Sequence, residues 1–381
     1  MKMGDILSNS IESHFGRITD PRRETKNKQH KFHDILIIAI CGSICGGNDW
    51  VAIERFGQSK FEWFSSFLEL PNGIPSHDTF NDVFSKLDPS EFEAGFISWV
   101  SSIAHLLPGE VVAIDGKTLR RSHDKGAGKS AIHMVSAWAS RNSLVLGQLK
   151  TEEKSNEITA IPELLNHLAL KGCLVTIDAM GCQKNIVKTI VDQEADYLIA
   201  LKENQPKLYE SVVDYFEDSK EKNGEDCAID FSETIEKNHG RDEKRRCWVG
   251  RDIDRIESAD QWERLNAVVM IESERTLNGK TSLEHRYYIS SADTDAEKLL
   301  SATREHWGIE NSLHWVLDVA FREDDSRLRK KNGAQNAAIL KHIALNLLKK
   351  ETSAKVGIQN KRLMAGWNHK YLRKVLDGIH T

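Results

Sequence analysis

Two short apolar runs, each followed by an aspartate, constrain the fold of this chain more than any other feature. Residues 111–114 lead into Asp115, and residues 174–177 lead into Asp178. Runs of this length that are rich in β-branched residues predict strands inside a sheet, covered on both faces. Because the carboxyl ends of such strands meet at one edge of the sheet, we expect the two carboxylates to come close together.

The order of the elements predicted around these runs indicates the fold class. Strand-like alternation gives way to helical periodicity and returns twice. The predicted elements are strand 110–119, hairpin strands 131–139 and 143–149, helix 156–168, strand 174–177, helix 183–193 and strand 197–201. Three strands followed by a helix, a strand, a helix and a strand predict an α/β protein with a mixed sheet flanked by helices.

Changes in pattern along the chain predict its domain organisation. Residues 1–105 are predicted to form a helical N-terminal domain that contacts DNA, and residues 106–350 the α/β domain. Residues of about 224–292 have strand patterns and follow Asp178, so we interpret them as a β-rich insertion. Residues 351–381 are predicted to be a basic helical tail. At 381 residues, the chain is long enough for two or three domains.

A third acidic residue lies in a predicted helix late in the chain. Residues 303–317 have helical periodicity, and Trp307, Glu310 and His314 fall on or near one face. That face is mostly apolar, so we expect Glu310 to lie in a buried stripe and Trp307 and Trp315 to lie in the core. A buried carboxylate is unfavourable unless it is paired or binds a cation.

The three acids together suit the chemistry of phosphodiesters. Hydrolysis or transfer of a DNA phosphodiester uses two divalent cations, one at the attacking oxygen and one at the leaving oxygen. Mg²⁺ and Mn²⁺ bind carboxylate oxygens and need few protein ligands. Each aspartate alone is more often a turn former, and Asp115 alone also resembles a phosphatase-type nucleophile. The phosphatase alternative requires an acid two residues later, where Lys117 stands.

The composition predicts an ordinary soluble protein. The chain has 52 Lys and Arg residues against 57 Asp and Glu, a net charge of −5, so a DNA-binding surface would have to be a local basic patch. The six cysteines form no CxxC pair, which predicts reduced thiols rather than structural zinc. The longest apolar run, residues 35–45, is too short to span a bilayer, and we find no leader segment. We therefore expect a cytoplasmic protein with no membrane partner.

A family resemblance rests on six short motifs spread over nearly the whole chain. The motifs are IPSHDTF at 74–80, IDGKTLR at 114–120, KSNEI at 154–158, DAMGCQ at 178–183, HGR at 239–241 and HWGIENSLHWVLD at 306–318. In this order they resemble the H-repeat-associated insertion-sequence transposases of bacteria. The resemblance implies an RNase H-like core, a transposase-associated N-terminal domain and a DDE triad. The predicted triad, Asp115, Asp178 and Glu310, would be catalytic and would bind two Mg²⁺ or Mn²⁺ ions.

The chain departs from the broader transposase group around its last acid. That group has Tyr, Arg, Glu and Lys at positions where this chain has Thr303, His306, Glu310 and Leu317. We expect His306, together with Arg304, to replace the arginine that contacts phosphate.

Seven basic or polar residues are predicted to contact DNA. They are Lys117, Lys202, Gln205, His239, Arg241, Arg304 and His306. A solvated turn is an equal alternative for the loop at residues 202–205, and a structural hairpin tip is an equal alternative for His239 and Arg241.

The predicted function is metal-dependent strand cleavage and strand transfer at the ends of a bacterial insertion sequence. Its expected partners are the terminal inverted repeats and target DNA, and pairing two ends is compatible with a homodimer in the DNA complex. One alternative is a DNA-binding protein of transposase descent without transposition activity. Another is a structure-selective nuclease that cuts without joining.

Overall fold

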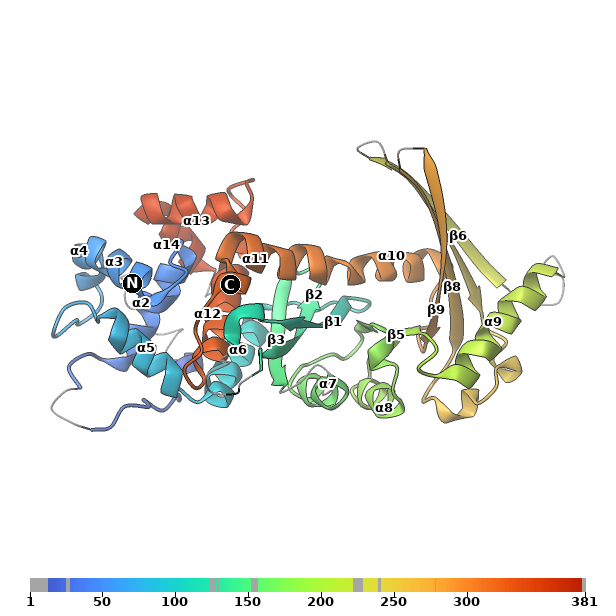
Figure 1. The fold of residues 1–381 in the computed structure, drawn as a ribbon, viewed down its shortest axis with the longest axis horizontal. Coiled ribbons are helices and arrows are strands. Elements are labelled where there is room, and N and C mark those ends of the chain that lie inside the picture. The colour runs from blue at the N-terminus through green and yellow to red at the C-terminus, as the bar shows by residue number, and fades with distance from the viewer. Residues whose placement is uncertain are drawn as a thin grey trace.

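The structure, a computed structural model, describes residues 13–24, 28–123, 128, 130–151, 157–221, 229–238, 241–277 and 279–378. Within these residues the chain is an α/β protein in which a long sheet runs between helices (Figure 1). Residues 154–156 of the KSNEI motif and His239 and Gly240 of the HGR motif lie outside the described residues.

Helices form the first part of the described chain, as the sequence predicts. They are α2 (Phe32–Ile44), α3 (Trp50–Ser59), α4 (Phe61–Ser65), α5 (His77–Lys86) and α6 (Pro89–Ile103). Side-chain oxygens cap three of them, because they accept hydrogen bonds from N–H groups of the first turn that have no partner within the helix. The capping residues are Asp49 for α3, Ser76 for α5 and Asp88 for α6.

The described strands join in a single sheet. Its core strands are β1 (Val111–Thr118), β2 (His133–Ala139), β3 (Leu144–Thr151), β4 (Leu174–Ile177) and β5 (Asp196–Leu201). They lie in the order β3-β2-β1-β4-β5. The first three strands pair antiparallel, whereas β4 is parallel to β1 and β5 is parallel to β4. This is the RNase H-like arrangement, and it confirms the predicted fold class.

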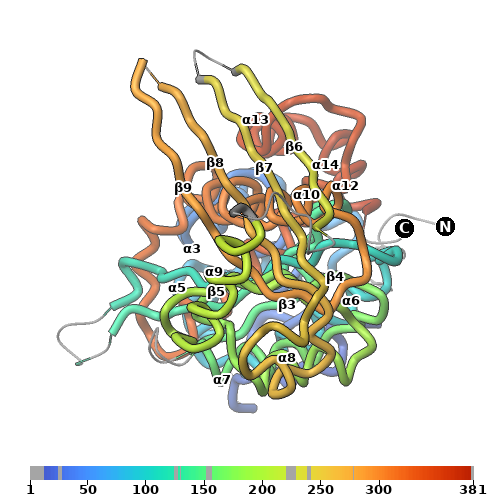
Figure 2. Tube along the Cα trace, turned by 90° about the vertical axis from the view of Figure 1, so that its right-hand side faces the viewer, coloured from blue at the N-terminus to red at the C-terminus, as the bar shows by residue number. Residues whose placement is uncertain are grey.

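The predicted β-rich insertion continues this sheet. Along the chain, α9 (Pro206–Glu221) comes before the four strands of the insertion. In the sheet, these strands lie beyond β5 in the order β9-β8-β7-β6. The inserted strands are β6 (Ile229–Asn238), β7 (Arg241–Gly250), β8 (Ala267–Leu277) and β9 (Lys280–Ser290). β9 pairs with β5 from Leu198↔Ser290 to Leu201↔Tyr287. The far ends of these strands project from the body of the molecule (Figure 2), and we call β6–β9 the arm.

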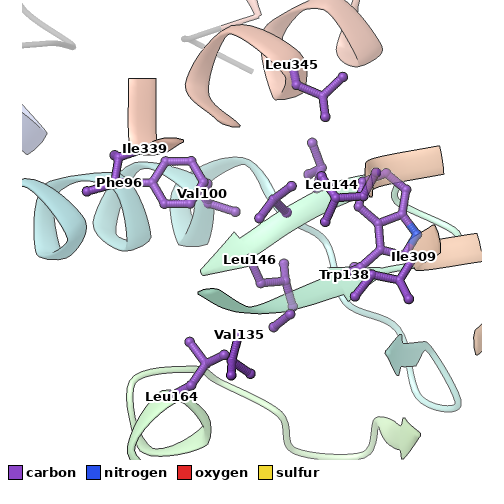
Figure 3. Packing of buried hydrophobic residues seen from close by; sticks show 14 of the residues in the cluster. Phe96, Val100, Val135, Trp138, Leu144, Leu146, Leu164, Ile309, Ile339 and Leu345 are labelled. Carbon is purple, nitrogen blue, oxygen red and sulfur yellow. The ribbon is translucent and has the colours of Figure 1, made fainter. Parts of the chain in front are cut away.

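Helices cover both faces of the core sheet. Figure 3 shows Leu164 beside Val135 of β2 on one side, with Phe96 and Ile339 on the other. Leu164 belongs to α7, whereas Phe96 and Ile339 belong to α6 and α12. The flanking helices not yet given are α7 (Glu157–Asn166), α8 (Lys184–Asp192) and α12 (Gly333–Lys350). These side chains are fully or almost fully buried and belong to one hydrophobic cluster, which joins the N-terminal helices to the sheet.

The predicted helix over residues 303–317 is divided by a π-helical turn. The segments are α10 (Ala296–His306), the π turn (Ile309–His314) and α11 (Trp315–Phe321). A π turn has a wider repeat than an α-helix, so it changes which side chains share a face.

This change of repeat overturns two predictions about the late helix. Ile309, Leu313 and Leu317 form the buried side, whereas Glu310 is exposed, so the expected buried stripe around Glu310 is wrong. Trp307 and Trp315 are also not core residues, since they are 43% and 61% exposed.

The C-terminal segment is helical and packs against other helices. It forms α13 (Ile358–Trp367) and α14 (His369–Asp377). Arg362 is 1% exposed and donates a hydrogen bond to the carbonyl oxygen of Ser43 at the end of α2 (2.8 Å). Its guanidinium also lies 4.0 Å from the ring of Phe321. In the described part of the chain, no helix combines the length and the hydropathy needed to cross a membrane.

Candidate active site

The register of the core sheet places the two aspartates side by side. β1 and β4 pair in parallel with Ile114 opposite Ile177, and Asp115 and Asp178 are the next residues on the two strands. Neighbouring strands are about 4.8 Å apart, so the two residues lie close together. Asp178 follows the end of β4, as predicted, whereas Asp115 is not at a strand end, because β1 continues to Thr118. The prediction that these strands lie next to each other inside the sheet is confirmed by this pairing.

Glu310 reaches the same place from the helical layer. Its π turn contacts β1, and α10 contacts β1 and β4. The side chains of Asp115, Asp178 and Glu310 all line one cavity of about 970 Å³. The exposure of Glu310 is therefore exposure toward this cavity. A π turn within a helix is frequent at functional sites, because its wider repeat turns side chains out of the regular helical face.

The charge of Asp115 is coupled to those of the other two acids. Its side chain is 24% exposed. Burial raises the pKa of Asp115 to about 7, and the carboxylates of Asp178 and Glu310 contribute to the rise. The N–H of Gly116 opposes it by donating a hydrogen bond to Asp115 Oδ1 (2.8 Å). A bound cation would relieve the repulsion among the three carboxylates.

The three carboxylates do not converge into a finished metal centre. Asp178 Oδ1 accepts hydrogen bonds from the N–H groups of Met180 (3.0 Å) and Gly181 (3.4 Å), which close the short 3₁₀ turn Ala179–Gly181. Across the described ranges, no three His, Cys, Asp or Glu side chains form a group that could hold a metal ion. The donor set nevertheless fits Mg²⁺ or Mn²⁺, because both prefer carboxylate oxygens.

A buried His–Glu pair lies directly behind Gly116. His133 Nε2 and Glu157 Oε1 form a hydrogen-bonded ion pair, and His133 Nδ1 is 2.9 Å from Thr118 Oγ1. A Cβ added at Gly116 would lie within 3.0 Å of both His133 and Glu157, so glycine is required next to Asp115. Sequence reasoning noted Glu157 as part of a motif but missed His133. The available signal was a polar pair across the predicted strands, since His133 lies opposite Thr118 in the register of β1 and β2.

Lys117 is held by carboxylates and does not face the cavity. Its ammonium lies 2.5 Å from Asp318 and 2.9 Å from Glu323, and its side chain is 12% exposed. Glu323 is 4% exposed, and Lys341 of α12 approaches it at 3.8 Å. Although burial acts in the opposite direction, Glu323 and Asp318 raise the pKa of Lys117. We therefore do not retain Lys117 as a DNA contact, since its charge is already matched inside the protein.

His314 is a neighbour of Asp115 that the predicted site did not include. Its Nδ1 lies 3.5 Å from Asp115 Oδ2, and its Nε2 is buried without a hydrogen-bond partner among the described residues. Burial lowers the pKa of His314 to about 3, with a further contribution from Lys117. The imidazole is therefore neutral at ordinary pH. Its place four residues after Glu310 was the signal that could have marked it.

Of the three positions that depart from the broader group, Thr303 and His306 line the cavity, and Leu317 is a core residue. Thr303 is buried and donates its hydroxyl hydrogen to the carbonyl oxygen of Leu300 (2.8 Å), and Leu317 is 1% exposed. His306 lines the cavity, and its Nδ1 is 3.0 Å from Thr176 Oγ1. Burial lowers the pKa of His306, and Asp178 acts in the opposite direction.

The two predicted DNA contacts in the loop after β5 differ in their surroundings. Lys202 is exposed and lines the cavity. Gln205 instead donates from Nε2 to the carbonyl oxygen of Cys182 (2.9 Å), which ties the loop to the segment after Asp178. Gln205 does not line the cavity.

The remaining predicted contacts belong to the arm and its surroundings. Arg304 forms an ion pair with Glu236 of β6 (2.5 Å), so it links α10 to the arm. Arg241 begins β7, and His239 lies outside the described residues. Arg286 of β9, which sequence reasoning missed, lines the cavity and lies 4.9 Å over the ring of Trp307.

Comparisons with known proteins bear on what this geometry serves. Residues 107–347 match the family described as Transposase DDE domain, and residues 12–100 match the family described as DDE_Tnp_1-associated. The chain is 44% identical over 371 residues to "Putative transposase YncI" of Escherichia coli O157:H7, across 96% of this chain and 94% of that protein. It is 42% identical over 363 residues to "H repeat-associated putative transposase YhhI" of Escherichia coli strain K12, across 93% and 95%. A structure of the piggyBac transposase synaptic complex with hairpin DNA aligns with a TM-score of 0.46 and 13% identity, over 99% of this chain and 79% of that chain.

Proposed function

Because this chain belongs to the Transposase DDE domain family, we propose that it is a DNA transposase that cuts at the ends of an insertion sequence and joins them to target DNA. One observation carries the proposal. The carboxylates of Asp115 in β1, Asp178 directly after β4 and Glu310 in the π turn line a single cavity. A carboxylate whose pKa is raised by burial and by two neighbouring carboxylates, as that of Asp115 is, is an expected feature of a cation-dependent site.

Asp115, Asp178 and Glu310 would together hold two divalent cations, Mg²⁺ or Mn²⁺. When bound, the cations would activate the attacking oxygen and stabilise the leaving oxygen. Backbone groups of the chain hold two of these carboxylates in place, because Gly116 N–H donates to Asp115 and the N–H groups of the following 3₁₀ turn donate to Asp178.

The proposed reaction has two phosphoryl-transfer steps. In the first, water attacks the phosphodiester at the element end, the P–O3′ bond breaks, and a free 3′-OH remains. In the second, that 3′-OH attacks a target phosphodiester and displaces another 3′-oxygen, so one bond forms as one breaks. No covalent protein–DNA intermediate is needed, because positioning and electrostatics supply most of the catalysis.

Three cavity residues are suited to contact the DNA backbone beside the acids. Lys202 brings positive charge to the cavity, and His306 brings an imidazole to the wall near Asp178. Arg286 also lines the cavity, where Glu284 pairs with it (2.8 Å). Arg304 remains a weaker candidate, since Glu236 already pairs with it. Contacts of this kind position a phosphate without reading sequence.

A cleavage assay tests the proposed function. Purified protein is incubated with a labelled duplex that carries the terminal repeat flanking its gene, with Mg²⁺, Mn²⁺ or a chelator. We expect a cut at the repeat boundary that needs the cation and disappears in Asp115→Ala, Asp178→Ala and Glu310→Ala. The matched control is Glu297→Ala, an acid of the first turn of α10 that does not line the cavity. Metal-independent cutting, or full activity in any triad variant, would refute the assignment.

The same assay separates the alternative functions. Joined products in addition to cut products support a transposase, whereas cut products alone support a structure-selective nuclease. Retarded migration of the duplex without any cut would support a DNA-binding protein of transposase descent. The residues that keep this last function open are Thr303 and Leu317, which stand where the broader group has polar residues.

A further inference from the structure

Two loops beyond the ends of β1 and α11 bring together a group of mostly exposed cations. The first is the 3₁₀ turn Arg120–Ser122, which follows β1, and the second is the loop 326–332, which follows the 3₁₀ turn Glu323–Asp325. We call their six cations the basic patch: Arg120, Arg121, Arg327, Arg329, Lys330 and Lys331. The two loops touch directly, because Arg329 Nε donates to the carbonyl oxygen of Arg121 (3.1 Å).

The basic patch keeps an excess of positive charge in a chain whose net charge is −5. Within these segments Asp324 pairs with Arg120 (3.2 Å) and Asp325 pairs with Arg121 (3.4 Å). Glu323 of the same turn is buried and pairs with Lys117, so its negative charge does not neutralise the basic patch. Arg120 is 80% exposed, and such surface pairs are worth little in water, so its guanidinium can exchange Asp324 for another anion.

The basic patch lies on the opposite side of the acids from the base of the arm. Val111, at the start of β1, packs with arm residues such as Val269, and the N–H of Ala296, at the start of α10, donates to Asp230 of β6 (2.7 Å). Both β1 and the α10–α11 run therefore leave the arm, pass an acid and end at the basic patch. Arg120 is five residues beyond Asp115, or at most about 17 Å of extended chain.

A duplex that reaches the acids extends easily over this distance. Duplex DNA carries one phosphate charge per about 1.7 Å of its axis, so a duplex whose reacting phosphate lies at the acids presents about ten phosphates over 17 Å. The cations come from loops rather than from a helix shaped for a groove, which suits backbone contact without base readout.

We propose that the basic patch binds the phosphate backbone of duplex DNA, without regard to sequence, on the side of the acids away from the arm. This inference rests on the proposed function, because it takes the acids as the place of reaction. The basic patch would hold a part of the duplex whose sequence does not have to be recognised. Target DNA is a duplex of this kind.

The test is the salt dependence of binding to duplex DNA in the presence of a chelator. Fluorescence anisotropy gives Kd over a range of KCl concentrations for an unrelated duplex and for a duplex carrying the terminal repeat. The variant, called the basic-patch variant, carries Arg120→Gln, Arg327→Gln and Lys330→Gln. Lys330, like Arg120, pairs with one surface carboxylate, that of Asp82 (3.6 Å). Since each lost phosphate contact reduces the slope of log Kd against log[salt] by about 0.9, we expect the slope to fall by up to about 2.7 on both duplexes.

A second triple variant controls for net charge. Lys171→Gln, Lys188→Gln and Lys207→Gln remove the same charge from exposed lysines that, like Arg120, each pair with one carboxylate. We expect this control to keep the wild-type slope. An equal loss in the control, an unchanged slope in the basic-patch variant, or a change seen only on the repeat-bearing duplex would overturn the inference. The single variant Arg327→Gln, with an expected slope change of about 0.9, covers the case in which the triple variant fails to fold.

Failure of this inference is distinguishable from failure of the proposed function. Binding is measured without cation and without cleavage, and Glu310→Ala should bind as the wild type does. A chain that cuts at the repeat but keeps its salt slope in the basic-patch variant would refute only the inference. A chain that loses slope as expected but never cuts would refute only the proposed function.

Discussion

Replacing Lys117 by Met tests whether the buried ion-pair network holds β1 in place. The substitution leaves Glu323, which is 4% exposed, without its nearest cation, and leaves Asp318, which is 32% exposed, without its partner. Lys341 stays 3.8 Å from Glu323 but has no short hydrogen bond to it. Removing one partner of a buried ion pair is strongly destabilising, because the other charge stays out of water.

The magnitude follows from the electrostatics of Glu323. Burial raises its pKa, but Lys117 and Lys341 outweigh burial and lower the pKa of Glu323 from 4.5 to about 2. A shift of that size corresponds to about 3 kcal/mol, of which Lys117 supplies the larger part. Asp318 adds less, since water reaches it. We expect Lys117→Met to lower the free energy of unfolding by about 2–4 kcal/mol.

The assay is urea unfolding followed by circular dichroism, arranged as a double-mutant cycle. In a Glu323→Gln background, Lys117→Met should cost less than about 1 kcal/mol, because no buried charge is then left unpaired. The control Lys188→Met removes a lysine that pairs with Asp192 on the surface and should leave the urea midpoint unchanged. A loss of less than about 1 kcal/mol in the wild-type background, or an equal loss in both backgrounds, would refute the reasoning.

Three further predictions concern the same region. Gly116→Ala should destabilise the protein by about 1–3 kcal/mol in urea unfolding, because the new Cβ would clash with His133 and Glu157. The control is Gly357→Ala, where a new Cβ would have no neighbouring atom within 4 Å. Equal losses of stability in the two variants would contradict the explanation. Asp115→Asn should abolish cleavage yet raise the thermal midpoint of the cation-free protein. The pKa of Asp115 is raised from 3.8 to about 7, so its ionisation lowers the free energy of unfolding by at most about 4 kcal/mol above pH 7 and by little below pH 4. A rise in the thermal midpoint of Asp115→Asn that is as large at pH 5 as at pH 8 would contradict this. Because the pKa of Glu323 is lowered, its ionised side chain contributes fully to stability above pH 4.5, and this contribution is lost as the pH falls through about 2. The free energy of unfolding should therefore fall by about 2 kcal/mol less between pH 6 and pH 3 in Glu323→Gln than in the wild type.

Much of the core could be predicted because it follows from local patterns. The apolar runs before Asp115 and Asp178 indicated strands, and β1 and β4 do pair in parallel with these residues level. The family resemblance is confirmed as well, since the matched motifs span the chain and the Transposase DDE domain family covers residues 107–347. The roles given to the triad and to the individual DNA contacts stay predictions.

The features that sequence missed depend on tertiary context. A 3.6-residue repeat gave no sign of the π turn, so it placed Glu310 inside and Trp307 and Trp315 in the core. Lys117 looked like a DNA contact because its partners, Asp318 and Glu323, are about 200 residues away in the sequence. Arg362 belongs to the segment predicted as a basic helical tail, but it is buried and donates to the carbonyl oxygen of Ser43 in the last turn of α2. Such long-range pairings leave no periodic signal in one sequence.

The continuity of the sheet from β5 into the arm has a consequence for how such chains can diversify. Among the described strands, the arm pairs with the core sheet along the stretch where β5 meets β9, from Leu198↔Ser290 to Leu201↔Tyr287, and α10 also contacts β6 and β7 at the base of the arm. Beyond that junction, β6–β9 pair only with one another, so residues added or removed in matched positions at the tips shift no core strand. An insertion or deletion close to β5, by contrast, would displace β5, which pairs with β4, the strand directly before Asp178. Lineages descended from such a chain should therefore differ in the length of the arm while the junction stays fixed.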